Sequence, residues 1–275
     1  MQEHDFGKIL FDLRAKIPGR RDIRLLGIFH AVNERSSRPA KDEEYLKKAL
    51  SKHRGLIFSE DFDKKYVRAF VPQDFVVKTQ PLENPLIGLI GQLAGIQQPS
   101  SLLESLSFNR YSTNRFIARE SELMVLKKPK TRQQELKFVK KFIGRKGKSP
   151  EFRFKSNVRS VFMAAEALKQ SRLENQDLAV VVGVFHANQM HRFITDPKAT
   201  IAYLSMIKPQ VEIAVESSLA RKSTFAEEQI KEKIKESIKL TPLRTVFENA
   251  MNEFKLLLKP EEEQELRQKG YLPNV

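Results

Sequence analysis

The chain of 275 residues is long enough for one large α/β domain, or for one domain with a helical appendage. Its 49 Lys and Arg outnumber 34 Asp and Glu, and the resulting net charge of +15 permits an acidic or polyanionic partner. Cysteine is absent, which excludes disulfides, thiolate metal sites and a cysteine nucleophile.

The N-terminus and the most apolar stretch of the chain bear on its location. The opening sequence MQEHDFGKILFDLRAK is charged throughout and lacks the apolar core of a secretory signal. The most apolar stretch, residues 86–96, is shorter than the roughly 20 residues that a membrane-spanning helix needs. We therefore expect no membrane span and a cytoplasmic location.

The N-terminal part of the chain predicts a strand, a helix and a second strand. Residues 23–29 are rich in β-forming residues, and residues 41–53 carry apolar side chains at helical spacing. Residues 56–58 then begin a second short apolar run. A βαβ unit of this length implies parallel strands within one sheet.

The second half predicts one buried strand among helices. Residues 157–170 have helical spacing, and the unbroken apolar run from Leu178 to Phe185 is typical of a strand buried on both faces. We expect a helix at residues 200–207 and a short strand at residues 211–215 to follow.

The C-terminal residues predict two further helices. Thr224 and Glu227 have the spacing of a capping box, and Pro242 suits the first turn of the second helix. We expect these two helices to form an antiparallel hairpin. The predicted fold is therefore α/β, with a mostly parallel or mixed sheet and flanking helices in residues 1–220 and the C-terminal helical hairpin in residues 221–275.

The same short pattern follows two of the predicted strands. Gly27 to His30 and Gly183 to His186 each consist of a glycine, two apolar residues and a histidine. The carboxyl ends of parallel strands line the ligand crevice of open α/β sheets. Glu60 ends the strand that follows the first of these motifs. The sequence thus predicts that His30, Glu60 and His186 lie at one edge of the sheet.

Two imidazoles and a carboxylate form a ligand set that suits Mn, Co or Zn and leaves positions open for water. A metal of this kind lowers the pKa of bound water to about 7 and so provides a nucleophile. We predict that His30, Glu60 and His186 bind a divalent metal. The alternatives are ordinary loop or core histidines and an exposed acid at position 60, next to which Asp61 could serve equally well.

These motifs resemble the TraB/PrgY family, whose Tiki relatives are membrane-associated metalloproteases. The resemblance covers roughly residues 20–215. Its parts are a GxxH strand, a strand ending in glutamate, an arginine-bearing helix ending in Met-Ala and a second GxxH strand. In this chain they match Gly27 to His30, Leu56 to Glu60, Arg159 with Met163-Ala164, and Gly183 to His186.

The resemblance implies a metal-dependent hydrolase, a peptidase among the options, that acts on a peptide or a small molecule through His30, Glu60 and His186. Arg159 is a further catalytic candidate, because it could polarise a carbonyl or hold a substrate carboxylate. The family commonly has Glu-Arg-Asn where this chain has Val158-Arg159-Ser160. The missing glutamate leaves open a catalytically degenerate protein that binds a ligand or peptide, so whether the protein is an enzyme stays undecided at this point.

A basic window occupies residues 127–155, with twelve Lys and Arg against two acids. We expect an exposed loop from Gly144 to Pro150, with Phe138 and Phe142 packed inward. The window could be a solvated loop, a lid that attracts acidic substrates, or a surface that binds nucleic acid through phosphates. On the last interpretation the protein would be a basic nucleic-acid-associated protein and its likeness to TraB accidental.

Overall fold

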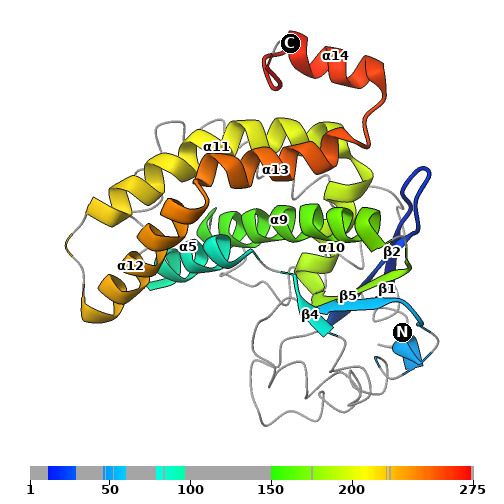
Figure 1. The fold of residues 1–275 in the computed structure, drawn as a ribbon, viewed down its shortest axis with the longest axis horizontal. Coiled ribbons are helices and arrows are strands. Elements are labelled where there is room, and N and C mark those ends of the chain that lie inside the picture. Colours follow the sequence, from blue (N-terminus) through cyan, green and yellow to red (C-terminus); the bar gives the residue numbers. More distant parts are fainter. Residues whose placement is uncertain are drawn as a thin grey trace. The chain divides into compact units, whose positions relative to one another are not determined.

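The computed structural model describes residues 12–28, 46–59 except 47 and 52, 79–96 except 83, and 150–273 except 175, 221 and 223. Within these ranges the chain combines a mixed sheet with helices, and its C-terminal part is helical (Figure 1). The α/β fold class predicted from the sequence is therefore confirmed. None of the helices in these ranges is long and apolar enough to cross a bilayer.

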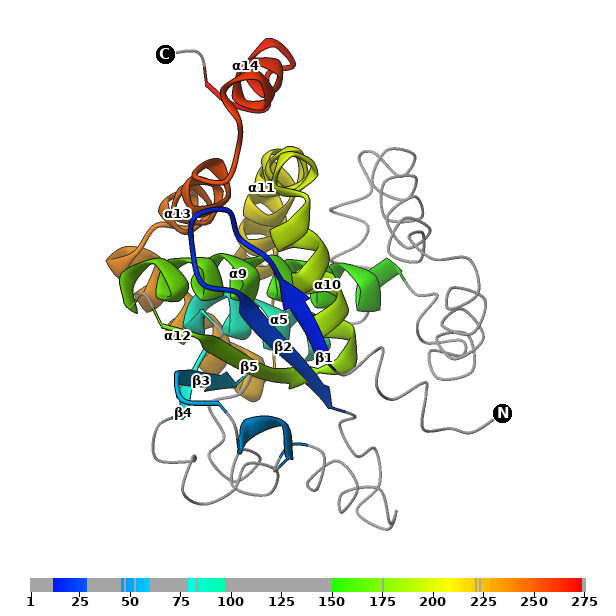
Figure 2. The same cartoon turned by 90° about the vertical axis from the view of Figure 1, so that its right-hand side faces the viewer.

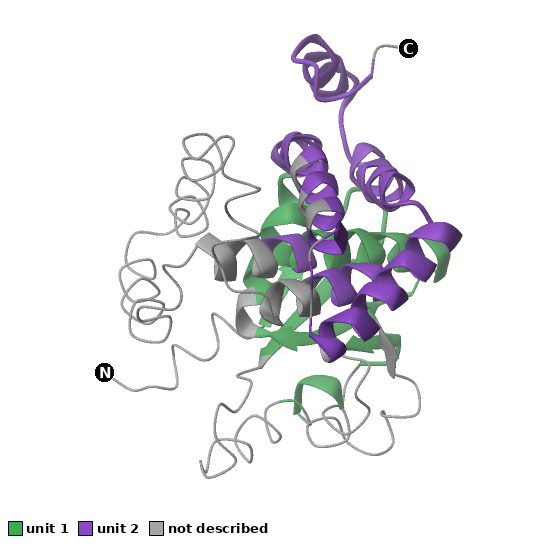
Figure 3. Ribbon diagram, turned by 90° about the vertical axis from the view of Figure 1, so that its left-hand side faces the viewer, with its two compact units in different colours: residues 1–84, 160–196 green, residues 85–159, 197–275 purple. Residues whose placement is uncertain are grey.

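The chain divides into two compact units (Figure 3). The first comprises Met1–Asn84 and Ser160–Asp196, and the second comprises Pro85–Arg159 and Pro197–Val275. The first unit contains the sheet, and the second contains most of the helices. One boundary between them falls inside a long helix, between Arg159 and Ser160.

The sheet of the first unit has five strands in the order β1-β2-β5-β3-β4. Their bounds are β1 Asp12–Ala15, β2 Ile23–Ile28, β3 Leu56–Ser59, β4 Thr79–Pro81 and β5 Leu178–Gly183. β1 runs antiparallel to β2, and the other neighbours are parallel. All six residues of β5 are buried, as its uninterrupted apolar sequence predicts for a central strand.

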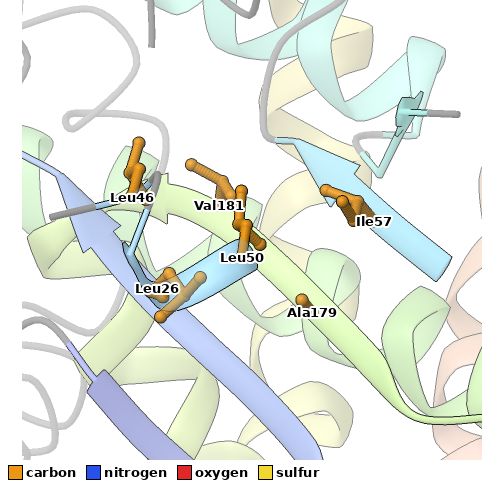
Figure 4. Packing of buried hydrophobic residues seen from close by; sticks show 7 residues of the cluster. Leu26, Leu46, Leu50, Ile57, Ala179 and Val181 are labelled. Carbon is orange, nitrogen blue, oxygen red and sulfur yellow. The ribbon is translucent and has the colours of Figure 1, made fainter. Parts of the chain in front are cut away.

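Both faces of this sheet are covered by helical structure (Figures 1 and 2). On one face lies the helical segment around residues 46–50, and on the other lies helix α10, Val184–Thr195, which contacts β1, β2 and β5. The side chains of the first face alternate along the strands, as a period of two requires. This buried cluster consists of Leu26, Leu46, Ala49, Leu50, Ile57, Ala179 and Val181 (Figure 4).

Strand β5 is shorter than the sequence predicts. It ends at Gly183, and α10 begins at Val184 without a loop, so the predicted strand end at Phe185 is wrong. Val184 and Phe185 favour strands locally, but the buried residues Ala187 and Met190 have helical spacing and cover the sheet. The tertiary packing of α10 therefore determines the boundary.

Helix α9, Pro150–Glu174, confirms the helix predicted at residues 157–170 and extends beyond it at both ends. Its part in the first unit is anchored to the turn that connects β1 and β2. Ser171, which is buried in α9, donates a hydrogen bond of 3.4 Å to the carbonyl oxygen of Arg21. This contact holds the C-terminal half of α9 against the edge of the sheet.

The described part of the second unit is helical. It contains α5 Pro85–Ile96, α11 Pro197–Ala220, α12 Phe225–Leu240, α13 Leu243–Lys255 and α14 Pro260–Gln268, besides the start of α9. The strand predicted at residues 211–215 is wrong, because α11 continues through it. Val211 and Val215 are buried four residues apart, so this apolar pair belongs to a helix face rather than to a strand.

The C-terminal helices α12 and α13 form as the sequence predicts, but their packing differs from the prediction. The capping box is present, because Thr224 N donates to Glu227 Oε2 at 2.7 Å and Glu227 N donates to Thr224 Oγ1 at 3.4 Å. Among the described residues, α12 packs mainly on α5 and α13 on α11, rather than on each other as a hairpin. The two helices therefore pack on different partners, α12 on α5 and α13 on α11.

Candidate functional site

The strands that carry the two GxxH motifs are direct neighbours. β2 and β5 are parallel, and Ile28 at the end of β2 lies opposite Gly183 at the end of β5. On the other side of β5, Ser59 at the end of β3 lies opposite Val181. The carboxyl ends of these three strands therefore meet at one edge of the sheet, with β5 in the middle.

Each predicted ligand follows the end of one of these strands. His186 lies in the first turn of α10, directly after β5, where it is only 8% exposed. His30 follows β2 and Glu60 follows β3, and both lie outside the described residues. The topology on which the site prediction depends is thus present, while the convergence of the three side chains stays a prediction.

His186 is held by a hydroxyl from the neighbouring helix. Ser160 of α9 has its Oγ 2.7 Å from Nδ1 of His186. The same Oγ donates a hydrogen bond to Oε1 of Gln189, which lies one turn beyond His186 on the same face of α10. Ser160 has no exposed surface, and Gln189 is 7% exposed. The three side chains form a buried polar cluster in the first unit.

The sequence alone predicts no role for Ser160 or Gln189, and Ser160 stands where the TraB/PrgY family commonly has an asparagine. The spacing of His186 and Gln189 could have revealed the cluster. The two residues are three positions apart, so they lie on the same face of a helix that begins after Gly183. The overlong strand prediction concealed this helical spacing.

Arg159 is half-buried in α9 and immediately precedes Ser160 in the chain. The unit boundary separates Arg159 from Ser160, so Arg159 belongs to the second unit and His186 to the first. Its role as a catalytic residue beside His186 therefore stays a prediction.

The other two histidines within the described ranges have structural roles. His53 Nε2 lies 3.0 Å from the carbonyl oxygen of Leu56, and His191 Nε2 lies 3.2 Å from that of Arg14. A carbonyl oxygen only accepts hydrogen bonds, so both histidines donate through Nε2. His53 holds the entry to β3, and His191 ties α10 to β1.

The donor chemistry at the end of β5 is compatible with a metal ligand. Metal-binding histidines usually engage their second ring nitrogen in a hydrogen bond that fixes the ring, and Ser160 provides such a bond to His186. The described ranges contain no group of three His, Asp or Glu side chains placed to hold a metal. Any such set at this edge must therefore include residues outside them, as the assignment of His30 and Glu60 requires.

The basic window lies mostly outside the described residues. The structure describes it from Pro150 onward, where α9 begins, so Phe138, Phe142 and the expected loop up to residue 149 are not covered.

Comparison with models of known protein families, with curated proteins and with solved structures yields no significant match to this chain. The resemblance to the TraB/PrgY family therefore rests on the paired motifs and on their order in the chain.

Proposed function

We propose that the protein is a divalent-metal-dependent hydrolase of the TraB-like type, with His30, Glu60 and His186 as its metal ligands and a peptide or small molecule as its substrate. The observation that supports this most is the adjacency of the strands. The residues that follow β2, β5 and β3 are those of the two GxxH motifs and the glutamate, and these strands are parallel neighbours. A cytoplasmic location is part of the proposal, since a chain without cysteine suits a reducing compartment.

The proposed roles follow from the chemistry of each side chain. His30 and His186 would offer neutral imidazole nitrogens, and Glu60 would offer a carboxylate oxygen or accept a proton from water. A divalent metal bound there would supply a Lewis acid and lower the pKa of water to about 7. Arg159 would hold a carboxylate or carbonyl of the substrate.

A second candidate is a protein of the same kind that binds metal or ligand without turnover. The observation that favours it is Val158, which stands where the family commonly has a glutamate and is 4% exposed. A buried valine can neither transfer a proton nor bind a metal. If that glutamate normally supplies acid/base chemistry, the metal site would persist here while hydrolysis would be lost.

Metal content and turnover of the purified full chain separate these possibilities. The chain is loaded with Mn, Co or Zn, freed of excess metal, and analysed for bound metal and for hydrolysis of a peptide library and of ester substrates. His30→Ala and His186→Ala should each lose the metal, and His53→Ala, which alters a histidine with a structural role, should retain it. Glu60→Ala should lower activity more than Asp61→Ala.

The outcomes are distinct. One bound metal with turnover that a chelator abolishes supports the hydrolase. Stoichiometric metal without turnover selects the second candidate. Absence of bound metal, or equal activity in the wild type and the His30→Ala/His186→Ala double variant, overturns the proposal.

A further inference from the structure

We infer that Ser160 is a positioning residue that fixes the tautomer of His186, placing the proton on Nδ1 and the lone pair on Nε2, and that Gln189 sets the direction of the serine hydroxyl. The inference concerns this buried cluster itself. Its use in metal binding rests on the function proposed above.

The assignment follows from counting hydrogens. A serine hydroxyl has one hydrogen, and that of Ser160 is donated to Oε1 of Gln189. Toward Nδ1 of His186, which is 2.7 Å away, Ser160 can therefore only accept. Nδ1 must carry a hydrogen, and a neutral imidazole with its proton on Nδ1 has its lone pair on Nε2.

Burial makes this arrangement persistent. Ser160, His186 and Gln189 are all buried, so breaking either of these hydrogen bonds would cost more than it would at a position exposed to water. Two elements contribute to the cluster, since Ser160 comes from α9 while His186 and Gln189 share a face of α10. The ring is thus oriented by groups that lie deep in the first unit.

The consequence is that Nε2 is the nitrogen of His186 that carries the lone pair, which binding of a metal or a proton requires. It lies on the side of the ring away from Ser160, because the two nitrogens of an imidazole point in divergent directions. Histidine ligands of metals commonly have this construction, in which a hydrogen bond from one nitrogen sets the tautomer and the other nitrogen binds. The cluster would prepare His186 for the role that the paired motif predicts.

The opposite hydrogen-bond order predicts the opposite tautomer. If the amide nitrogen of Gln189 donated to Ser160, the serine would donate to Nδ1 and the proton would be on Nε2. The position of the proton on the His186 ring therefore shows the direction of these hydrogen bonds, and it can be measured without any metal or substrate.

The test uses the metal-free full chain labelled with ¹⁵N at histidine and held at pH 8. Long-range ¹H–¹⁵N correlation spectra distinguish protonated from unprotonated ring nitrogens, and the spectrum of His186→Ala assigns the signals. We expect His186 to show a protonated Nδ1 in the wild type. A protonated Nε2 would overturn the inference, and this outcome does not depend on the folding of any variant.

Two matched variants then test whether Ser160 is the cause. Ser160→Ala should convert the His186 signals to those of a mixture of tautomers, whereas Ser171→Ala, which changes another buried serine of α9, should leave them unchanged. Gln189→Leu should have the same effect as Ser160→Ala. If folded Ser160→Ala retains a fully protonated Nδ1, Ser160 does not set the tautomer.

Metal affinity separates this inference from the proposed function. If both hold, Ser160→Ala weakens metal binding by about 10- to 100-fold, the usual effect of removing such a partner, and Ser171→Ala does not. A protonated Nδ1 in a chain that binds no metal leaves the tautomer assignment standing and overturns the proposed function alone.

Discussion

Ile28 and Gly183 lie opposite each other at the carboxyl ends of two neighbouring parallel strands. His30 and His186 follow them in the sequence within three residues, so the strands that begin the two GxxH motifs end side by side. His53 precedes β3 and therefore lies at the opposite edge of the same sheet. This difference between the two edges allows the proximity of His30 and His186 to be tested directly.

Because the chain has no cysteine, two introduced cysteines can form a disulfide within the chain only with each other. We predict that the double variant His30→Cys/His186→Cys forms a disulfide readily under mild oxidation, because such a bond needs Cα atoms within about 7 Å. The control His53→Cys/His186→Cys should not form one. Non-reducing gel mobility and mass spectrometry measure the yield. Equal yields for both pairs, or none for the first, would contradict a shared site.

Gly55 is required by space rather than by backbone conformation. An added Cβ at Gly55 would lie 1.7 Å from the carbonyl oxygen of Asp177, a backbone atom that cannot rotate away. We predict that Gly55→Ala lowers the free energy of unfolding by about 3 kcal/mol or more, at the upper end of overpacking effects. Urea denaturation followed by circular dichroism measures this.

Gly19 provides the comparison for Gly55. It has a positive φ of 69° and nothing within 4 Å of the position of an added Cβ. Gly19→Ala should therefore lower the free energy of unfolding only by the cost of placing alanine in the left-handed conformation, about 1 to 2 kcal/mol. A Gly55→Ala variant that is as stable as Gly19→Ala would show that the segment before β3 moves away from Asp177.

The sequence predicted the sheet well because its signals are local. The unbroken apolar run of β5 indicates a buried central strand by itself, and the helix between two apolar runs implies parallel pairing. The antiparallel edge strand β1 was not predicted, since its sequence, DLRA, has no distinctive pattern. It pairs with β2 and is also held by a partner far away in the chain, as the contact between His191 and Arg14 illustrates.

The site was predicted only in part, for a related reason. The repeated GxxH pattern drew attention to His186 and to the carboxyl end of β5, because an unbroken apolar run followed by polar residues is a local signal, although the strand itself ends at Gly183. The roles of Ser160 and Gln189 depend on the packing of α9 against α10, which no local pattern encodes. Similarly, the run around Val211 reads as a strand until the helix that surrounds it is known.

Glu265 of α14 joins two lysines in the second unit. It accepts hydrogen bonds from Lys198 of α11 and from Lys269, the latter at 2.6 Å. The bond from Lys198 foremost, together with that from Lys269, lowers the pKa of Glu265 from 4.5 to about 2. Because the folded-state pKa is lower than the unfolded one, this carboxylate stabilises the fold above about pH 4.5, and the contribution is lost as the pH falls toward 2.

We therefore predict that Glu265→Gln is less stable than the wild type at pH 7 and that this difference shrinks as the pH falls from 4.5 toward 2. The effect should be small and weakened by salt, since these groups are solvent-accessible. Urea unfolding at a series of pH values measures it, and Glu236→Gln, at an exposed position of α12, is the control. A difference that stays constant with pH would show that Glu265 acts through packing instead.

Arg24 connects three parts of the first unit through one guanidinium group. Its Nε and Nη2 donate to the two carboxylate oxygens of Asp12 at 2.9 and 2.7 Å, and its Nη1 donates to the carbonyl oxygen of Ala49 at 2.7 Å. The bonds join β2 to the edge strand β1 and to the helical segment that covers this face of the sheet. A planar fork is needed to make all three, and lysine has none.

We predict that Arg24→Ala lowers the free energy of unfolding by about 1 to 3 kcal/mol, because it removes charge-assisted bonds and leaves Asp12, whose side chain is 30% exposed, without this partner. Arg24→Lys should restore less than half of the loss, since a single ammonium group cannot reproduce the two parallel bonds to Asp12. Arg54→Ala, at an exposed position, should change stability by less than about 0.5 kcal/mol. Denaturant titration measures all three variants. Full recovery in Arg24→Lys would show that charge alone, and not the fork geometry, holds β1 on the sheet.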